Sequence, residues 1–161
     1  MDALARLNDI LAREAIVYTE IEQLEAQKTG AIIDRDGAKI DSITRRQDEL
    51  ITHVSAIDSE RQRMVDSIAE MSGLPKEAPL SQLVGDGDPL AFHIKSNAKS
   101  LRRTLERLTS IHVGNTRLIE DNLEFFRLVL SGMKESEVQG YGKDGAIEQL
   151  SRSSAFLNIT V

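Results

Sequence analysis

Residues 38–71 read AKIDSITRRQDELITHVSAIDSERQRMVDSIAEM, and this stretch decides the fold. Alternating steps of three and four residues place ten positions on one helical face, and eight of them are apolar: Ile40, Ile43, Gln47, Leu50, Val54, Ile57, Arg61, Met64, Ile68 and Met71. This spacing predicts one long helix with coiled-coil-like packing. Ile51 and Val65 lie beside the stripe, and they are expected to widen it enough for a third helix to pack.

Both flanks of this stretch carry helix-ending signals. Upstream, the apolar positions of residues 2–33 repeat every seven residues, which predicts another helix. Asp34–Gly37 interrupts that pattern, and Asp36 is expected to cap the helix that follows. Downstream, Gly73 before a proline is expected to end the helix in a left-handed cap.

A connector and a third helix follow. Residues 76–88 contain Pro79, two glycines and a short apolar piece, which predicts one helical turn lying over a bundle end. From Pro89 to about Met133, apolar stripes again repeat at seven residues and predict a third long helix. Past that point no helical period survives.

The fold prediction is therefore all-α: an elongated antiparallel bundle of about three long helices over residues 1–133, with a flexible tail over residues 134–161. The tail holds three glycines and ends in FLNITV, a short β-prone apolar patch. Whether residues 1–71 form one bent helix or a hairpin stays open from the sequence.

Composition limits the classes of function. The chain of 161 residues carries a formal charge of -6, which disfavours general nucleic-acid binding. It has no cysteine, which fits a reducing compartment, and the start of the sequence shows no signal-peptide pattern. No stretch approaches the ~20 apolar residues needed to span a bilayer. We therefore expect a cytoplasmic protein without direct membrane insertion.

Catalytic and metal-binding chemistry is not expected. His53, His93 and His112 lie far apart in the sequence, and no metal-ligand spacing, phosphate-binding loop or nucleophilic constellation stands out. We expect no cofactor, no metal and no enzymatic activity. The third helix also carries a local basic cluster, whose members are expected to pair with acids on a neighbouring helix rather than to bind phosphate: Lys95, Lys99, Arg102, Arg103 and Arg107.

The third helix carries two further features. Asn115 and Asn122 lie in one apolar stripe, where buried amides cost stability unless they are paired and so fix helix register. Near the helix end, apolar side chains cover almost every direction around the axis: Phe125, Phe126, Leu128, Val129, Leu130 and Met133. Either the 76–88 connector covers them, or they receive an amphipathic helix from another protein.

Three stretches of the sequence are similar to the FlgN family of flagellar export chaperones. The first runs from Asp36 to Gly73 and contains the charged helix IDSITRRQDEL. Within it, Arg45-Arg46-Gln47 differs from the Lys and Glu residues that are usual in the family. The second is GNTRLIEDNLEFF, residues 114–126, and the third is GYGKDG, residues 140–145. The order of helix, Asn-bearing helix and Tyr-Gly tail carries the resemblance.

The resemblance implies a cytosolic type III export chaperone. Such a protein would bind the C-terminal helices of the hook-filament junction proteins FlgK and FlgL and deliver them to the secretion gate, where FlhA is the docking protein. By this analogy Tyr141 docks on the gate, and client contact falls on Phe125, Phe126, Val129, Leu130, Met133, Phe156 and Leu157. The alternative interpretation is a coiled-coil structural or adaptor protein that self-associates through the same apolar seams.

Overall fold

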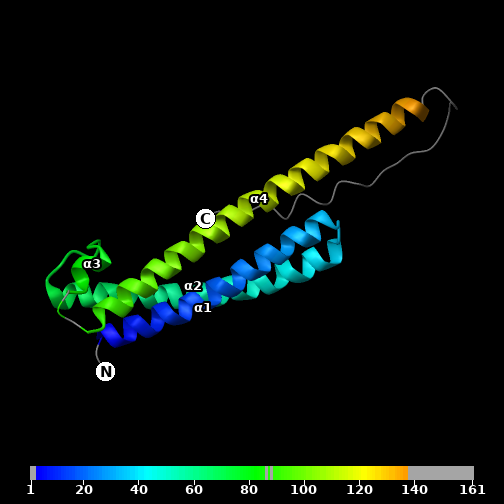
Figure 1. Cartoon of the computed structure of the whole chain (residues 1–161). Helices are drawn as coiled ribbons and strands as arrows, with labels where there is room; N and C mark the ends of the chain where they lie inside the picture. The colour runs from blue at the N-terminus through cyan, green and yellow to red at the C-terminus, as the bar shows by residue number, and fades with distance from the viewer. Residues whose placement is uncertain (1–2, 86, 88, 138–161) are drawn as a thin grey trace. The chain divides into compact units, whose positions relative to one another are not determined.

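The computed structural model describes residues 3–85, 87 and 89–137, with side chains described as far as residue 132. These residues form four helices and no strand: α1 (Ala3–Ile33), α2 (Gly37–Ser72), α3 (Leu80–Leu83) and α4 (Ala91–Glu137) (Figure 1). The prediction of an all-α bundle with three long helices is confirmed. The predicted tail begins too early, because residues 134–137 belong to α4. The rest of the tail, residues 138–161, lies outside the described part, and its flexibility stays a prediction.

The first two helices form a hairpin, which decides between the two alternatives left open by the sequence. Figure 1 shows α1 and α2 side by side with opposite chain directions. The turn between them is short because Arg35 takes a left-handed conformation (φ 56°) and the Asp36 amide donates back to the Ala31 carbonyl at 2.9 Å. As predicted, Asp36 caps α2, since its side chain accepts a hydrogen bond from the Lys39 amide at 3.0 Å.

The far end of α2 closes with the predicted glycine cap. Gly73 has φ 67°, in the left-handed region that favours glycine. The Leu74 amide reaches back to the Ala69 carbonyl at 2.9 Å, and the Gly73 amide donates to the Glu70 carbonyl at 3.2 Å. This pattern of backward hydrogen bonds satisfies carbonyls that a helix end otherwise leaves unpaired.

The stripe read from residues 40–71 is the face of α2 that packs on α1. Ile43, Leu50, Val54, Ile57 and Ile68 are buried. Two expectations at its margins are wrong. Met71 is 68% exposed because it belongs to the last turn of α2, just before the cap. Ile51 is 39% exposed and so does not widen the buried seam. Val65, by contrast, packs against the buried core.

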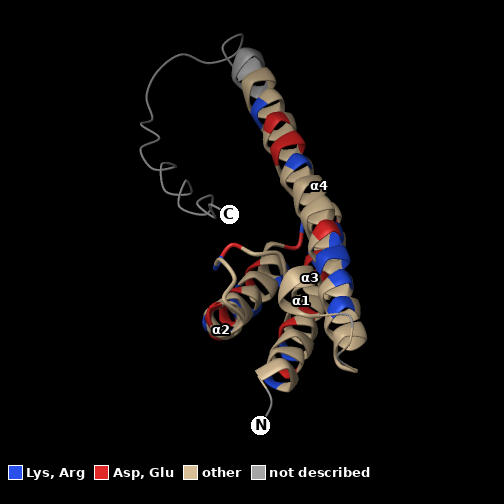
Figure 2. Cartoon of the chain, turned by 90° about the vertical axis from the view of Figure 1, so that its left-hand side faces the viewer, with Lys and Arg blue, Asp and Glu red and all other residues tan. Residues whose placement is uncertain are grey.

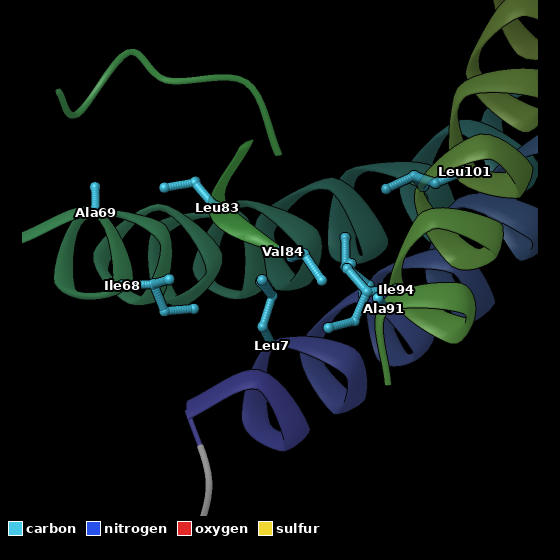
Figure 3. Close-up of a cluster of buried hydrophobic side chains, with 9 residues drawn as sticks. Leu7, Ile68, Ala69, Leu83, Val84, Ala91, Ile94 and Leu101 are labelled. Carbon is cyan, nitrogen blue, oxygen red and sulfur yellow. The ribbon is translucent and has the colours of Figure 1, made fainter. Parts of the chain in front are cut away.

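The core divides into two clusters along the helices. One cluster joins α1 and α2 and includes Ile10, Val17 and Leu50. The other gathers side chains from all four helices at the end where α1 begins, including Leu7, Ile68, Leu83 and Ile94 (Figure 3). The connector prediction is confirmed, because α3 and the following Val84 cover this end.

The first part of α4 runs parallel to α1. Asn97 donates to Asn8 at 2.9 Å, Arg107 to Glu22 at 2.7 Å, and Asn115 to Glu25 at 2.9 Å. Residue numbers increase together along both helices, so the two helices run in the same direction. The chain divides into two units, Met1–Asn122 and Leu123–Val161. The first unit contains α1, α2, α3 and the part of α4 as far as Asn122.

Candidate functional site

The end of α4 exposes a group of large apolar side chains to solvent, interrupted by Glu124 and Arg127. Every side chain from Leu123 to Gly132 is exposed. The large apolar residues in this run are each between 41% and 64% exposed: Leu123, Phe125, Phe126, Leu128, Val129 and Leu130. We call Leu123–Leu130 the apolar end of α4. Singly exposed apolar residues are ordinary on protein surfaces, whereas large contiguous apolar patches are typical of interaction sites.

Aromatic rings make up part of this surface. The rings of Phe125 and Phe126 lie edge to face, with centroids 6.1 Å apart and planes at 66°. Such pairs present a broad apolar face together with polarised ring edges. The surface therefore offers shape and apolar area, together with the exposed charges of Glu124 and Arg127.

The remaining client and gate residues fall outside what the structure describes. Met133 lies within α4, but its side chain is not among the described ones. Tyr141, Phe156 and Leu157 lie outside the described residues altogether. Whether the tail adds to the apolar end of α4 therefore stays a prediction.

The connector belongs to the first unit. Its apolar residues Leu83 and Val84 are buried in the cluster that contains Leu7, Ile68 and Ile94, at the start of α4. Coverage of the end of α4 by residues 76–88 stays a prediction. The exposure of Leu128, Val129 and Leu130 is what remains to be explained.

A buried polar cluster ties the three long helices together. Glu25 of α1 is 3% exposed, and Gln47 of α2 donates to its carboxylate at 2.7 Å. Asn115 of α4 donates to both the carboxylate and the backbone carbonyl of Glu25, at 2.9 Å each, and accepts from Thr29 at 2.7 Å. His112 Nδ1 lies 3.1 Å from Glu25 Oε1, the same carboxylate oxygen that accepts from Asn115. We call this group the Glu25 cluster.

Its hydrogen bonds hold Glu25 in the charged form. Burial by itself raises the pKa of Glu25, but the hydrogen bonds from Gln47 and Asn115 and the nearby Lys28 charge outweigh it and leave the pKa below its ordinary value. The Lys28 ammonium lies 3.3 Å from the carboxylate. Asn115 is buried and paired, and Asn122 is half-buried. The role of both in fixing helix register stays a prediction.

A second buried carboxylate lies between α1 and α2. Glu14 is 3% exposed, and the Arg61 guanidinium lies 3.1 Å from it. Burial raises the pKa of Glu14, and the neighbouring Asp58 adds to that rise, while Arg61 opposes it. Sequence reasoning missed both Glu14 and Glu25. The available signal was that each continues a seven-residue apolar stripe of α1, after Leu7 and after Tyr18 respectively.

The basic cluster pairs only partly as expected. Arg107 binds Glu22 of α1 through two hydrogen bonds, at 2.7 and 3.0 Å. Within the described part of the chain, Arg102 and Arg103 are exposed and form no ion pair. The expectation of pairing with a neighbouring helix is therefore wrong for these two.

Other features of the described residues offer little chemistry. A hollow of about 540 Å³ lies between α1, α2 and the connector, with Leu7, Leu11 and Leu83 among its lining residues. Residues 3–85, 87 and 89–132 contain no group of three or more His, Asp or Glu side chains placed to hold a metal ion. No described helix is both long and apolar enough to cross a bilayer.

A helical bundle with a filled aliphatic core and a solvent-facing apolar helix end has the architecture of a protein that binds other proteins. The family model described as FlgN protein matches residues 1–149. The chain therefore belongs to the FlgN family and is a flagellar export chaperone. No curated protein and no solved structure matches it.

Proposed function

We propose that this chaperone acts in the cytoplasm, binding the hook-filament junction proteins FlgK and FlgL and delivering them to the FlhA component of the secretion gate. The observation that carries the client part is the exposure of the apolar end of α4, where Leu128 is 64% and Leu130 58% exposed. An amphipathic helix binds to such a surface by burying its own apolar face against it. No enzymatic step is part of this function.

The proposed client contacts extend the apolar end of α4 into the tail. They comprise Phe125, Phe126, Val129, Leu130, Met133, Phe156 and Leu157. Met and Phe side chains adapt to clients of different shape, because the thioether is flexible and aromatic rings bury large areas. The C-terminal segments of junction proteins, if unfolded before assembly, would expose the complementary apolar faces.

The alternative, self-association through the apolar seams, is disfavoured because the seams already pack within one chain. Ile43, Leu50 and Val54 are buried against α1 within one chain. A coiled-coil adaptor of the kind considered above needs those side chains for a second chain. It would have to open the hairpin and unpair the Glu25 cluster, which costs stability.

The test is client binding by matched surface variants. Phe126→Asp and Leu130→Asp are expected to weaken binding of FlgK or FlgL C-terminal segments at least about tenfold, since a charge would be buried in the contact. Phe92→Asp is the control, because Phe92 is also on α4 and is 76% exposed, yet lies far along the helix from the proposed site. Calorimetry measures affinity, and circular dichroism checks that helicity is retained.

The outcomes separate the site from the function. If all three variants bind as the unaltered chain does, the client site lies elsewhere. Should the unaltered chain bind neither junction protein, the client assignment itself is wrong. For the gate, Tyr141→Ala is expected to lose FlhA binding while keeping client affinity. A loss of both activities would contradict a separate docking role.

A further inference from the structure

The first part of α4 lacks acidic side chains in a chain that is otherwise rich in them. The sequence holds 26 acidic residues, yet residues 89–105 contain none, and this is its longest stretch without one. The same stretch carries four cations: Lys95, Lys99, Arg102 and Arg103. Figure 2 shows Lys and Arg gathered along this part of α4, with Asp and Glu farther along the helix. A locally positive surface therefore lies on a protein whose net charge is -6.

Helix geometry places these four cations on one side of α4, together with Phe92. At 3.6 residues per turn, the five side chains fall within about 100° of the helix circumference and extend about 17 Å along the axis. Ile94 and Leu101 lie on the opposite side, where they are buried in the core. We call this side the basic face of α4: Phe92, Lys95, Lys99, Arg102 and Arg103.

Three of the four cations have no charged partner within the described part of the chain. Lys99, Arg102 and Arg103 are exposed, and none of them forms an ion pair with another described residue. Lys95 is half-buried. Arg107 is paired with α1 and is not part of the face. The positive charge of the basic face is therefore left for solvent ions or a partner to balance.

Phe92 adds an apolar group at one end of the face. Its side chain is 76% exposed, the largest exposure among the large apolar side chains that the structure describes. The ring lies edge to face with His93, with centroids 5.8 Å apart. An exposed phenylalanine beside Lys and Arg is typical of helices that lie on membrane surfaces, where the ring enters the headgroup region and the cations contact lipid phosphates.

We propose that the basic face of α4 binds the surface of a membrane that contains anionic phospholipids. Phe92 enters the boundary between headgroups and acyl chains, and the cations around it contact lipid phosphates. The contact is peripheral, because the other side of this part of α4 is packed in the core. The face belongs to the first unit, so this contact and the proposed client contact use different residues.

A bilayer fits this face better than a free anion or a nucleic acid does. One side of a helix is convex, so it has no walls to enclose a free phosphate group. Single-stranded nucleic acids bind through several aromatic side chains on which successive bases stack, whereas this face carries one ring. In a fluid bilayer, anionic lipids diffuse laterally and gather beneath a short positive patch. A polyanion that continued past the patch would instead meet Glu106 and the acidic remainder of the chain.

Co-sedimentation of the full chain with lipid vesicles, without client, tests the proposal. Vesicles of equal parts phosphatidylcholine and phosphatidylglycerol are expected to bind the chain at least about tenfold more tightly than vesicles of phosphatidylcholine alone. Raising the salt from roughly 0.05 to 0.5 M is expected to weaken this binding at least about tenfold, because salt screens the charges. Equal binding to both kinds of vesicle, or no binding to anionic vesicles at low salt, overturns the proposal.

Charge variants locate the contact. R102E/R103E is expected to weaken binding to the anionic vesicles at least about tenfold, because two attractive charges become repulsive. The matched control is K39E/R63E, which makes the same charge change at exposed positions of α2 and is expected to stay within about threefold. Glu106→Gln removes the acid that follows the face and is expected to tighten binding about twofold or more. If the control weakens binding as much as R102E/R103E does, the basic face is not the site. Circular dichroism checks that each variant keeps its helicity.

A tryptophan probe gives a second readout. The chain has no Trp, so Phe92→Trp places a single fluorophore on the face, and Ile16→Trp places one at a comparably exposed position of α1. Anionic vesicles are expected to shift the emission of Phe92→Trp to shorter wavelength, because the indole leaves water for the membrane interface. The emission of Ile16→Trp is expected to stay unchanged. Equal shifts in both variants, or none in Phe92→Trp, contradict the contact.

Fluorescence anisotropy with a labelled single-stranded RNA of about 20 nucleotides separates a bilayer from a nucleic acid. At the same salt and phosphate concentrations, the chain is expected to bind the RNA more weakly than the anionic vesicles. Tighter binding to the RNA overturns the membrane assignment in favour of a nucleic acid. None of these measurements includes client or gate protein, so their failure leaves the proposed function untouched.

Discussion

At the scale of single residues, polar interruptions of one apolar stripe meet polar interruptions of another. Gln47 and Arg61 are the two polar positions in the stripe of α2, and they contact Glu25 and Glu14 of α1. Read along the chain, each looks like an imperfection in the seven-residue pattern. Because the pairing partner lies on another helix, the sequence shows the interruption without showing its purpose.

Two buried carboxylates are expected to respond to acid in opposite ways. The folded pKa of Glu25 is below its ordinary value, so its charge stabilises the fold above the unfolded pKa and that contribution is lost as pH falls through the folded pKa. The folded pKa of Glu14 is raised, so its charged form costs stability and protonation relieves that cost as pH falls.

Urea unfolding at pH 7 and near pH 4 measures both effects. Glu25→Gln is expected to lower the free energy of unfolding by about 1–3 kcal/mol at pH 7, because a charged acceptor is removed from several donors. On acidification this variant is expected to lose less stability than the unaltered chain. Glu14→Gln is expected to lose more stability on acidification than the unaltered chain does. Acid profiles that match the unaltered chain in both variants would contradict these charge states.

At the scale of elements, local signals placed the helix ends well. The turn after Ile33, the cap at Asp36 and the left-handed Gly73 were all predicted, because each depends on a few neighbouring residues. The direction of α4 relative to α1 was not specified by any local signal. It follows from contacts such as Asn97 with Asn8, which join residues far apart in the chain.

Two glycine substitutions are expected to have opposite effects. Gly73→Ala forces a side chain into φ 67° and is expected to destabilise the chain by about 1 kcal/mol. Gly30→Ala lies inside α1, where an added Cβ meets nothing within 4 Å, and is expected to stabilise by about 0.5–1 kcal/mol. Thermal and urea unfolding of both variants measure the signs. Equal signs would mean that the cap conformation is not the determining factor.

At the scale of the whole molecule, the apolar end of α4 differs from the rest of that helix. Positions such as Ile94, Thr104 and Asn115 are buried, whereas every side chain from Leu123 to Gly132 is exposed. The sequence correctly indicated an apolar excess here. It did not indicate which end of the bundle the connector covers, because that depends on how Leu83 and Val84 pack.

Hydrogen exchange followed by mass spectrometry tests this difference. Amides of α4 after Asn122 are expected to exchange faster than those between Ala91 and Asn122, because a helical segment without a packed face is only marginally stable in water. A bound client helix is expected to slow exchange in the later segment by at least about tenfold, since packing then stabilises it. Uniform protection along α4 without client would contradict this expectation.

The Glu25 cluster also restricts how the length of this chain can vary. Glu25, Gln47 and Asn115 meet at one level of three helices, and Glu14 meets Arg61 at another. An insertion inside one helix between those levels would rotate and shift one partner away from the others unless its neighbours gained matching whole heptads. Natural or engineered insertions should therefore be tolerated in the segment joining α2 to α4, or beyond Asn122, and selected against between the two levels.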